Sequence, residues 1–205
     1  MIVVDFNKKW WLPILFLSPI ITGFSYLLVV LISGDSWSTG FTWSLLPNIV
    51  IMFFLGGPLG EELGWRGYAL EKIQKKENAL VSSLIIGFVW GLWHLPLHFI
   101  TGTTQEYIPI WAFILLQMIL SIIYTWIYNN THSVLAVMLF HWIGNASAML
   151  LPFWQKGFIG GEPSLPNYWV PSIGMLVVFF LNVLVALIII YIWKPEKLKK
   201  ENIPK

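Results

Sequence analysis

Long apolar segments are the feature that most restricts how this chain can fold. A helix needs about 20 mostly apolar residues to cross the hydrocarbon core of a membrane. Segments that meet this requirement lie at roughly 10–32, 41–63, 79–100, 108–128, 132–151 and 171–193. Backbone in lipid must satisfy its own hydrogen bonds, which favours helices. The sequence therefore predicts an all-α, polytopic membrane helix bundle of about six transmembrane helices, with residues 1–205 forming a single integral-membrane domain.

The placement of Lys and Arg predicts the orientation of this bundle. Six spans put both termini on one side, and that side holds every Lys and Arg of the chain except Lys156. Because segments rich in Lys and Arg stay in the cytoplasm, both termini are predicted to be cytoplasmic. The lysine-rich segment 194–205 is expected to be a topology anchor that contacts anionic lipid. Segment 10–32 lacks a convincing small-residue cleavage site, so it is predicted to be a span rather than a signal peptide.

Composition excludes several classes of protein. The chain is 57% hydrophobic and 11% charged, whereas soluble domains are about 25% charged. The absence of cysteine excludes disulfides, thiolate metal sites and a cysteine nucleophile. A net charge of +2 is too small to indicate nucleic-acid binding. The expected partner is the lipid bilayer, and no nucleic acid is expected.

Ionisable side chains within the predicted spans are the candidates for function. Such groups are costly in a membrane, so they usually face the bundle interior and mark a site. They are Glu61, Glu62, Arg66, His94, His98 and His141, with Asn145 as a polar companion. His98 is expected to be an interfacial or hydrogen-bonding residue, and His132 to belong to a turn.

Helical geometry predicts which of these groups meet. If the second and third spans form an antiparallel hairpin that turns at 76–78, Glu61 and His94 lie at the same depth. His141 is ten residues beyond Thr131, about 15 Å along the fifth span, which brings a third helix to this level. Trp90 shares a helical face with His94, four residues on.

Glu61 and Glu62 are expected to face different surroundings. Adjacent helical residues point about 100° apart, so both cannot face one pocket. Glu62 can pair with Arg66 at i,i+4, and we expect a solvated pair at a cytoplasmic helix end. Glu61 is then free to face a pocket. Small residues recur every fourth position, which predicts close backbone approach between helices, at Gly56, Gly60 and Gly64 and at Gly87 and Gly91.

Three short motifs lie in order on successive predicted helices. "EELGWR" fits EExxxR, "WGLWH" fits an aromatic residue followed by xxxH, and "HWIGN" fits HxxxN. Over about 45–150, their order, spacing and hydrophobic setting resemble the CPBP family, the type II CAAX proteases and bacteriocin-processing enzymes, also called the Abi family. The resemblance implies an intramembrane endopeptidase that acts on a peptide or membrane-protein substrate.

The matching motifs imply that Glu61 is the base that activates water. They also imply that His94, His141 and Asn145 lie beside it, with Asn145 stabilising the oxyanion. Supporting roles fall to Glu62, Arg66 and Trp90, where Trp90 replaces the phenylalanine of many members. Water must reach the base, so we expect a cavity that opens to the cytoplasm. The expected location is a bacterial plasma membrane.

Several alternatives stay open. Two His, one Glu and a water form a known catalytic zinc pattern, which Glu61, His94 and His141 could supply. No metal is favoured, because HExxH is absent and that pattern leaves only Glu62 as a separate carboxylate base. A second hypothesis for the function is a non-catalytic membrane immunity or scaffold protein that binds a peptide. A small transporter would predict inverted repeats, and the sequence contains none that we detect.

Overall fold

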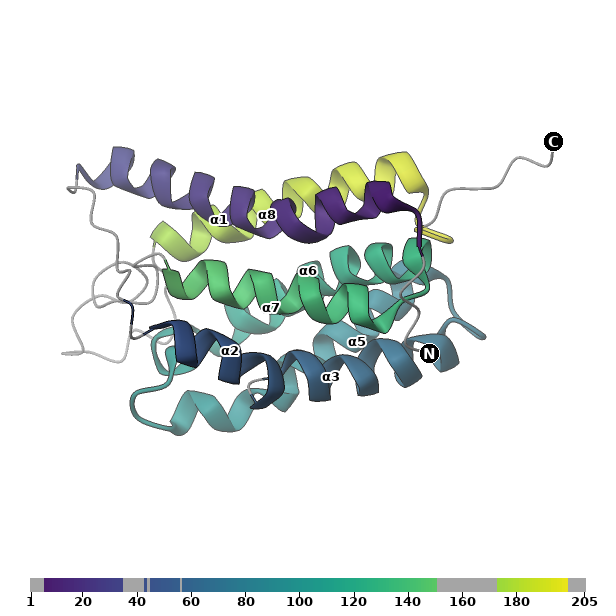
Figure 1. The fold of residues 1–205 in the computed structure, drawn as a ribbon, viewed down its shortest axis with the longest axis horizontal. Coiled ribbons are helices and arrows are strands. Elements are labelled where there is room, and N and C mark those ends of the chain that lie inside the picture. The colour runs from purple at the N-terminus through teal and green to yellow at the C-terminus, as the bar shows by residue number, and fades with distance from the viewer. Residues whose placement is uncertain (1–5, 35–42, 44, 56, 151–172, 199–205) are drawn as a thin grey trace.

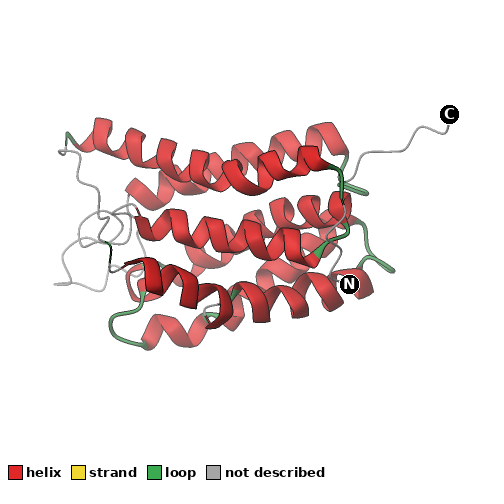
Figure 2. Ribbon diagram, in the orientation of Figure 1, coloured by secondary structure: helices red, strands yellow, loops and turns green. Residues whose placement is uncertain are grey.

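The computed structural model describes residues 6–34, 43, 45–55, 57–150 and 173–198. Every regular element within these ranges is helical (Figure 2). The fold class predicted from the sequence is therefore confirmed. Residues 152–171, between the fifth and sixth predicted spans, and the end of the lysine-rich segment lie outside the described residues.

The helices follow the predicted spans in order. The first span is preceded by a 3-10 turn, η1 (Lys8–Trp10), and forms α1 (Trp11–Ser33). The second is divided into α2 (Leu45–Leu55), α3 (Pro58–Gly64), a π-helical turn η2 (Trp65–Ala69) and α4 (Leu70–Ile73). The remaining elements are α5 (Ala79–Trp93), the 3-10 turns η3 (Leu95–Phe99) and η4 (Thr104–Tyr107), α6 (Ile110–Thr131), α7 (Val134–Leu150) and α8 (Ile173–Trp193).

Length and hydropathy identify the segments that can cross a membrane. Among the described residues they are Lys8–Ile32, Ala79–Phe99, Ile110–Thr131 and Ile173–Trp193, and α7 is a shorter apolar helix. The prediction of one continuous helix over 41–63 is wrong. Gly57 has φ of +117° between α2 and α3, a region that residues with a side chain rarely adopt, and Pro58 starts α3. The predicted helix 79–100 also ends early, at Trp93, before Pro96.

The helices pack as a bundle with a common axis (Figure 1). α1 and α8 lie side by side along one face and pack on each other, and α1 also packs on α7. α6 packs against α5, α7 and α8, while α3 packs against α7. The start of α1 and the end of α8 lie at the same end of the bundle, on the right in Figure 1. This arrangement agrees with the prediction that both termini lie on one side.

The end of the bundle that carries these termini is tightly connected. The Ala79 and Leu80 amides at the start of α5 donate to the carbonyls of Glu196 and Pro195, at 3.0 Å each. Asn129, near the end of α6, donates to the carbonyl of Lys197 at 2.8 Å. Pro195 and Glu196 therefore cap the start of α5, and Lys197 binds α6, contacts that were not predicted for this segment. All lysines among the described residues lie at this end, which we call the lysine end: Lys8, Lys9, Lys72, Lys75, Lys76, Lys194 and Lys197.

The close backbone approach predicted at the glycines is present at α5 but not at α3. A Cβ added at Gly87 would collide with the backbone of Met118, and one at Gly91 would lie 3.0 Å from the Cα of Ile114. These glycines let α5 and α6 approach closely. The same prediction is wrong for Gly60 and Gly64, because an added Cβ there has no neighbour within 4 Å.

Replacing Gly87 with alanine is expected to destabilise the protein by about 1–3 kcal/mol, because the added methyl group meets backbone rather than a flexible side chain. Gly64→Ala is the matched control. Its methyl group enters open space on a helix, so stability should be unchanged or slightly higher. Thermal unfolding of the purified variants in detergent measures both effects. Equal stabilities of the two variants would refute the close packing of α5 on α6.

Candidate active site

Glu61 is positioned by the break between α2 and α3. Its amide donates to the carbonyl of Gly57 at 2.7 Å, which closes the first turn of α3. Its carboxylate lies directly over Gly57, since a Cβ added there would be 2.5 Å from the Glu61 Oε1 atom. A glycine at 57 therefore supplies both the unusual backbone angle and the space for the carboxylate.

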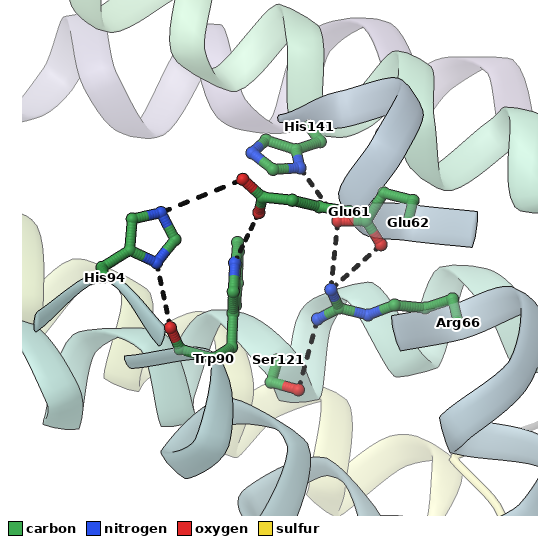
Figure 3. Close-up of polar contacts among 7 residues, drawn as sticks. All are labelled: Glu61, Glu62, Arg66, Trp90, His94, Ser121 and His141. Carbon is green, nitrogen blue, oxygen red and sulfur yellow. Dashed lines mark hydrogen bonds and ion pairs between the residues drawn. The ribbon is translucent and has the colours of Figure 1, made fainter. Parts of the chain in front are cut away.

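Two residues from the end of α5 face the Glu61 carboxylate (Figure 3). The indole Nε1 of Trp90 donates to Glu61 Oε2 at 2.6 Å. The Nε2 atom of His94 lies 4.0 Å from Glu61 Oε1. The Glu61 and His94 side chains are 11% and 12% exposed, respectively, so both are largely buried but still accessible. The hairpin geometry predicted that Glu61 and His94 lie side by side, and they do.

The second ring nitrogen of His94 fixes its tautomer. Nδ1 lies 2.9 Å from the carbonyl oxygen of Trp90. A carbonyl only accepts hydrogen bonds, so Nδ1 carries a proton and the neutral ring presents the Nε2 lone pair towards Glu61. The Trp90 carbonyl belongs to the last turn of α5, where carbonyls lack helical partners. Trp90 thus orients both the carboxylate and the imidazole.

Glu62 and Arg66 form a buried ion pair that also holds His141. Arg66 Nη1 donates to both Glu62 carboxylate oxygens, at 3.0 and 2.9 Å. The His141 Nδ1 atom lies 2.9 Å from Glu62 Oε1. Both members of the pair have 0% side-chain exposure. The pairing was predicted, but the expectation of a solvated interfacial pair is wrong. The helix continues through η2 and α4, so the pair lies inside the bundle rather than at a helix end.

The Arg66 guanidinium has further partners that compensate for its burial. Nη2 donates to Ser121 Oγ of α6 at 3.3 Å. The guanidinium carbon lies 4.9 Å from the Trp90 ring centroid and 4.6 Å from that of Tyr124. Aromatic faces attract cations, most strongly where water is excluded. Ser121 and Tyr124 were not predicted from the sequence, although polar side chains within an apolar span are rare enough to have indicated them.

A cavity of about 1230 Å³ brings the predicted catalytic residues together. Its walls include Glu61, His94, His141 and Asn145, whereas Glu62 and Arg66 do not line it. Because His141 donates through Nδ1 to Glu62, its Nε2 is left for the cavity. Asn145 is one turn further along α7. Within the described residues no side-chain hydrogen bond occupies the Asn145 carboxamide.

Two carboxamide side chains of the cavity wall were not predicted from the sequence. Gln117 of α6 and Asn182 of α8 are buried and line the cavity. Among the described residues, the Gln117 Oε1 atom has no hydrogen-bond partner, while the Asn182 Nδ2 atom donates to the carbonyl of Val178 at 2.8 Å. The rarity of polar side chains in apolar spans, which identified the histidines, would also have identified these residues.

The two remaining histidines lie outside the cavity wall. His98 is buried on η3 against the ring of Phe113, with ring centroids 5.2 Å apart. His132 has φ of +51° and ends α6 before the turn into α7, as the sequence suggested.

Glu61, His94 and His141 are the side chains that the sequence offered as zinc ligands. Within the described residues, no three His, Cys, Asp or Glu side chains are arranged to hold a metal ion. One Glu61 oxygen is taken by Trp90, and the other is 4.0 Å from His94 Nε2. Each histidine does have its Nδ1 held by an acceptor, as zinc-binding histidines usually do. The three groups nevertheless do not converge on one point.

Comparison with known proteins gives two findings. Residues 41–147 match the family model for type II CAAX prenyl endopeptidase, Rce1-like. A protein of Methanococcus maripaludis described as CAAX prenyl protease 2 is 33% identical over 156 residues, which cover 70% of this chain and 58% of that protein. This chain therefore aligns with somewhat more than half the length of that relative. The residues matched by the family model include Glu61, Glu62, Arg66, Trp90, His94, His141 and Asn145, whereas Asn182 lies beyond them.

Proposed function

This chain belongs to the Rce1-like family of type II CAAX prenyl endopeptidases, and from that premise we propose that it is an intramembrane endopeptidase that uses a glutamate-activated water. The observation that carries the proposal is the pairing of Glu61 Oε1 and His94 Nε2, 4.0 Å apart at the cavity wall. A water can contact both atoms, since each hydrogen bond needs about 2.8 Å.

In the proposed reaction, Glu61 takes a proton from this water while the water oxygen attacks the peptide carbonyl carbon. A carbon–oxygen bond forms, and the carbonyl oxygen becomes an oxyanion. The protonated Glu61 then gives its proton to the amide nitrogen as the carbon–nitrogen bond breaks, which releases an acid and an amine. Such proton transfers by a positioned side chain accelerate a reaction by about 10²–10⁴-fold.

Donors on α7 would stabilise the oxyanion. Asn145 offers an uncharged N–H group, and His141 offers its Nε2 when the ring is protonated beside the Glu62 carboxylate. Fixed donors in a sheltered site are effective because they need no reorganisation during the reaction. In this proposal Glu62 and Arg66 are positioning residues, since they act through His141 and do not line the cavity.

We propose that the reaction does not need a metal ion. Peptide hydrolysis by purified protein should survive a zinc chelator without loss of rate, because Glu61 itself activates the water. The measurement uses a quenched fluorescent peptide library with protein in detergent, with and without chelator. A loss of turnover on chelation that zinc restores would instead assign Glu61, His94 and His141 to a zinc site.

A non-catalytic immunity or scaffold protein is the competing proposal, and the size of the cavity is compatible with peptide binding alone. The intact set of Glu61, His94, His141 and Asn145 around one cavity favours catalysis. We place the protein in a bacterial plasma membrane, with a peptide or a membrane-protein segment as substrate.

A further inference from the structure

Gln117 of α6 is a buried carboxamide that the packing of the helices does not use. It lines the cavity and is 7% exposed, while its Oε1 atom is enclosed without a hydrogen-bond partner among the described residues. Gln74 shows the contrast, because its carboxamide exchanges two hydrogen bonds with that of Asn129, at 3.0 and 2.9 Å. A buried polar atom without a partner costs free energy. Stability alone therefore gives no reason for a polar side chain at position 117.

Gln117 lies on the same face of α6 as two residues that contact the proposed catalytic side chains. Four residues before it, Phe113 packs against the His94 ring with centroids 5.4 Å apart. Seven residues after it, Tyr124 packs against the His141 ring with centroids 5.5 Å apart. Such spacings keep residues on one helix face, and all three α6 residues line the cavity. Gln117 is about 6 Å along the helix from Phe113, roughly the length of two residues of extended chain.

A second helix, α8, runs beside α6 in the same direction. Near their starts, Val178 packs against the apolar cluster that contains Phe113. Near their ends, the Trp126 and Trp193 rings pack edge to face with centroids 5.1 Å apart, and Trp10 extends this aromatic stack at 4.8 Å from Trp126. Both helices therefore run towards the lysine end. The residues four positions after Phe113 and after Val178 lie at a similar depth, because the rise per residue is constant.

Those two residues are Gln117 and Asn182, and they offer complementary groups. Asn182 is 5% exposed and lines the cavity. Its Nδ2 atom donates to the Val178 carbonyl, so its Oδ1 atom is the acceptor left for the cavity. Because the Oε1 atom of Gln117 is enclosed, its Nε2 group is the donor left for the cavity. A donor and an acceptor at one level match the C=O and N–H groups of a peptide.

We propose that Gln117 and Asn182 bind the backbone of a peptide in the cavity, Gln117 by donating to a carbonyl and Asn182 by accepting from an N–H group. An extended peptide needs such partners, because its own backbone groups are unpaired and the neighbouring wall residues Leu116 and Leu120 are apolar. Backbone binding holds a segment independently of its side chains. The position of this segment beside a bond hydrolysed at Glu61 rests on the proposed function, whereas the binding itself does not.

Peptide affinity in the Glu61→Gln variant tests this site, because binding needs no turnover. Library peptides that carry a fluorophore are titrated with this variant in detergent, and fluorescence anisotropy gives Kd. Gln117→Met and Asn182→Leu, each added to it, keep the approximate size of the side chain and remove its polar groups. Each should raise Kd by roughly 3–10-fold, the effect of one neutral hydrogen bond. Gln74→Met is the matched control and should leave Kd unchanged, because Gln74 does not line the cavity.

Thermal unfolding of the same variants distinguishes a binding role from a structural one. Gln74→Met should lower the melting temperature, since it loses both hydrogen bonds with Asn129. Gln117→Met should not lower it, since the Gln117 Oε1 atom has no hydrogen bond to lose.

Peptide analogues in which one backbone amide at a time is replaced by an ester identify the contact directly. The ester lacks the N–H group, so one analogue should bind the Glu61→Gln protein more weakly and lose nothing further when Asn182→Leu is added. Unchanged Kd values in Gln117→Met or Asn182→Leu, or the absence of binding by every peptide, would overturn the proposal. A native protein that binds with these dependences but hydrolyses no peptide would support the site and refute the protease alone.

Discussion

Glu61→Gln is expected to lower kcat/KM for peptide hydrolysis by about 10²–10⁴-fold, the contribution of a general base. Glutamine has nearly the same size, and its oxygen can still accept the Trp90 indole N–H that now binds Oε2 at 2.6 Å. It cannot take a proton from water. The variant should therefore keep its fold and its cavity while losing turnover, as measured with the fluorescent peptides that the native protein cleaves.

The matched control is Glu77→Gln, the same chemical change at an exposed residue of the turn before α5. Its activity should equal that of the native protein. Hydrolysis separates the two proposed functions, because a protease loses it in the Glu61→Gln variant, whereas a binding protein shows none in the native form and binds peptide in both. Native rates of hydrolysis in the Glu61→Gln variant would remove Glu61 from the role of base.

Arg66→Met is expected to reduce the free energy of unfolding by about 3–5 kcal/mol, which is the usual effect of removing one member of a buried ion pair. The Glu62 carboxylate would lose its bidentate partner while remaining fully buried. The cation–π contacts of the guanidinium with the Trp90 and Tyr124 rings would also be lost. Thermal unfolding in detergent measures the loss.

Two further variants identify the cause. Lys72→Met removes a cation from an exposed position and should change stability by less than about 1 kcal/mol. Adding Glu62→Gln to Arg66→Met removes the unpaired charge and should recover part of the stability without restoring activity, since His141 would lose its charged acceptor. An Arg66→Met variant as stable as Lys72→Met would show that the buried pair contributes little to the fold.

The sequence predicted relations that depend on regular helical geometry. The depth match of Glu61 and His94 follows from a constant rise per residue on both arms of a hairpin. The pairing of Glu62 with Arg66 follows from i,i+4 spacing. Both survive in the structure, although the helix that carries Glu61 is interrupted at Gly57.

What the sequence could not predict depends on contacts between distant segments. The burial of Arg66 comes from Ser121 and Tyr124 on α6, and periodicity within 41–63 contains no information about them. Gly64 and Gly87 belong to the same sequence pattern of small residues, yet Gly64 has open surroundings and Gly87 contacts the backbone of α6. Only the packing of neighbouring helices distinguishes a glycine that admits another helix from one that borders a cavity.

The separation of the cavity wall from the aromatic stack of Trp10, Trp126 and Trp193 has a consequence for how such a protein can evolve. The cavity wall and this stack share no residue. Free-energy effects of substitutions add when the sites share no partners. Substitutions in the cavity wall are therefore expected to leave the contacts of this stack unchanged, so that its stability offsets the destabilising effect of changes at the cavity.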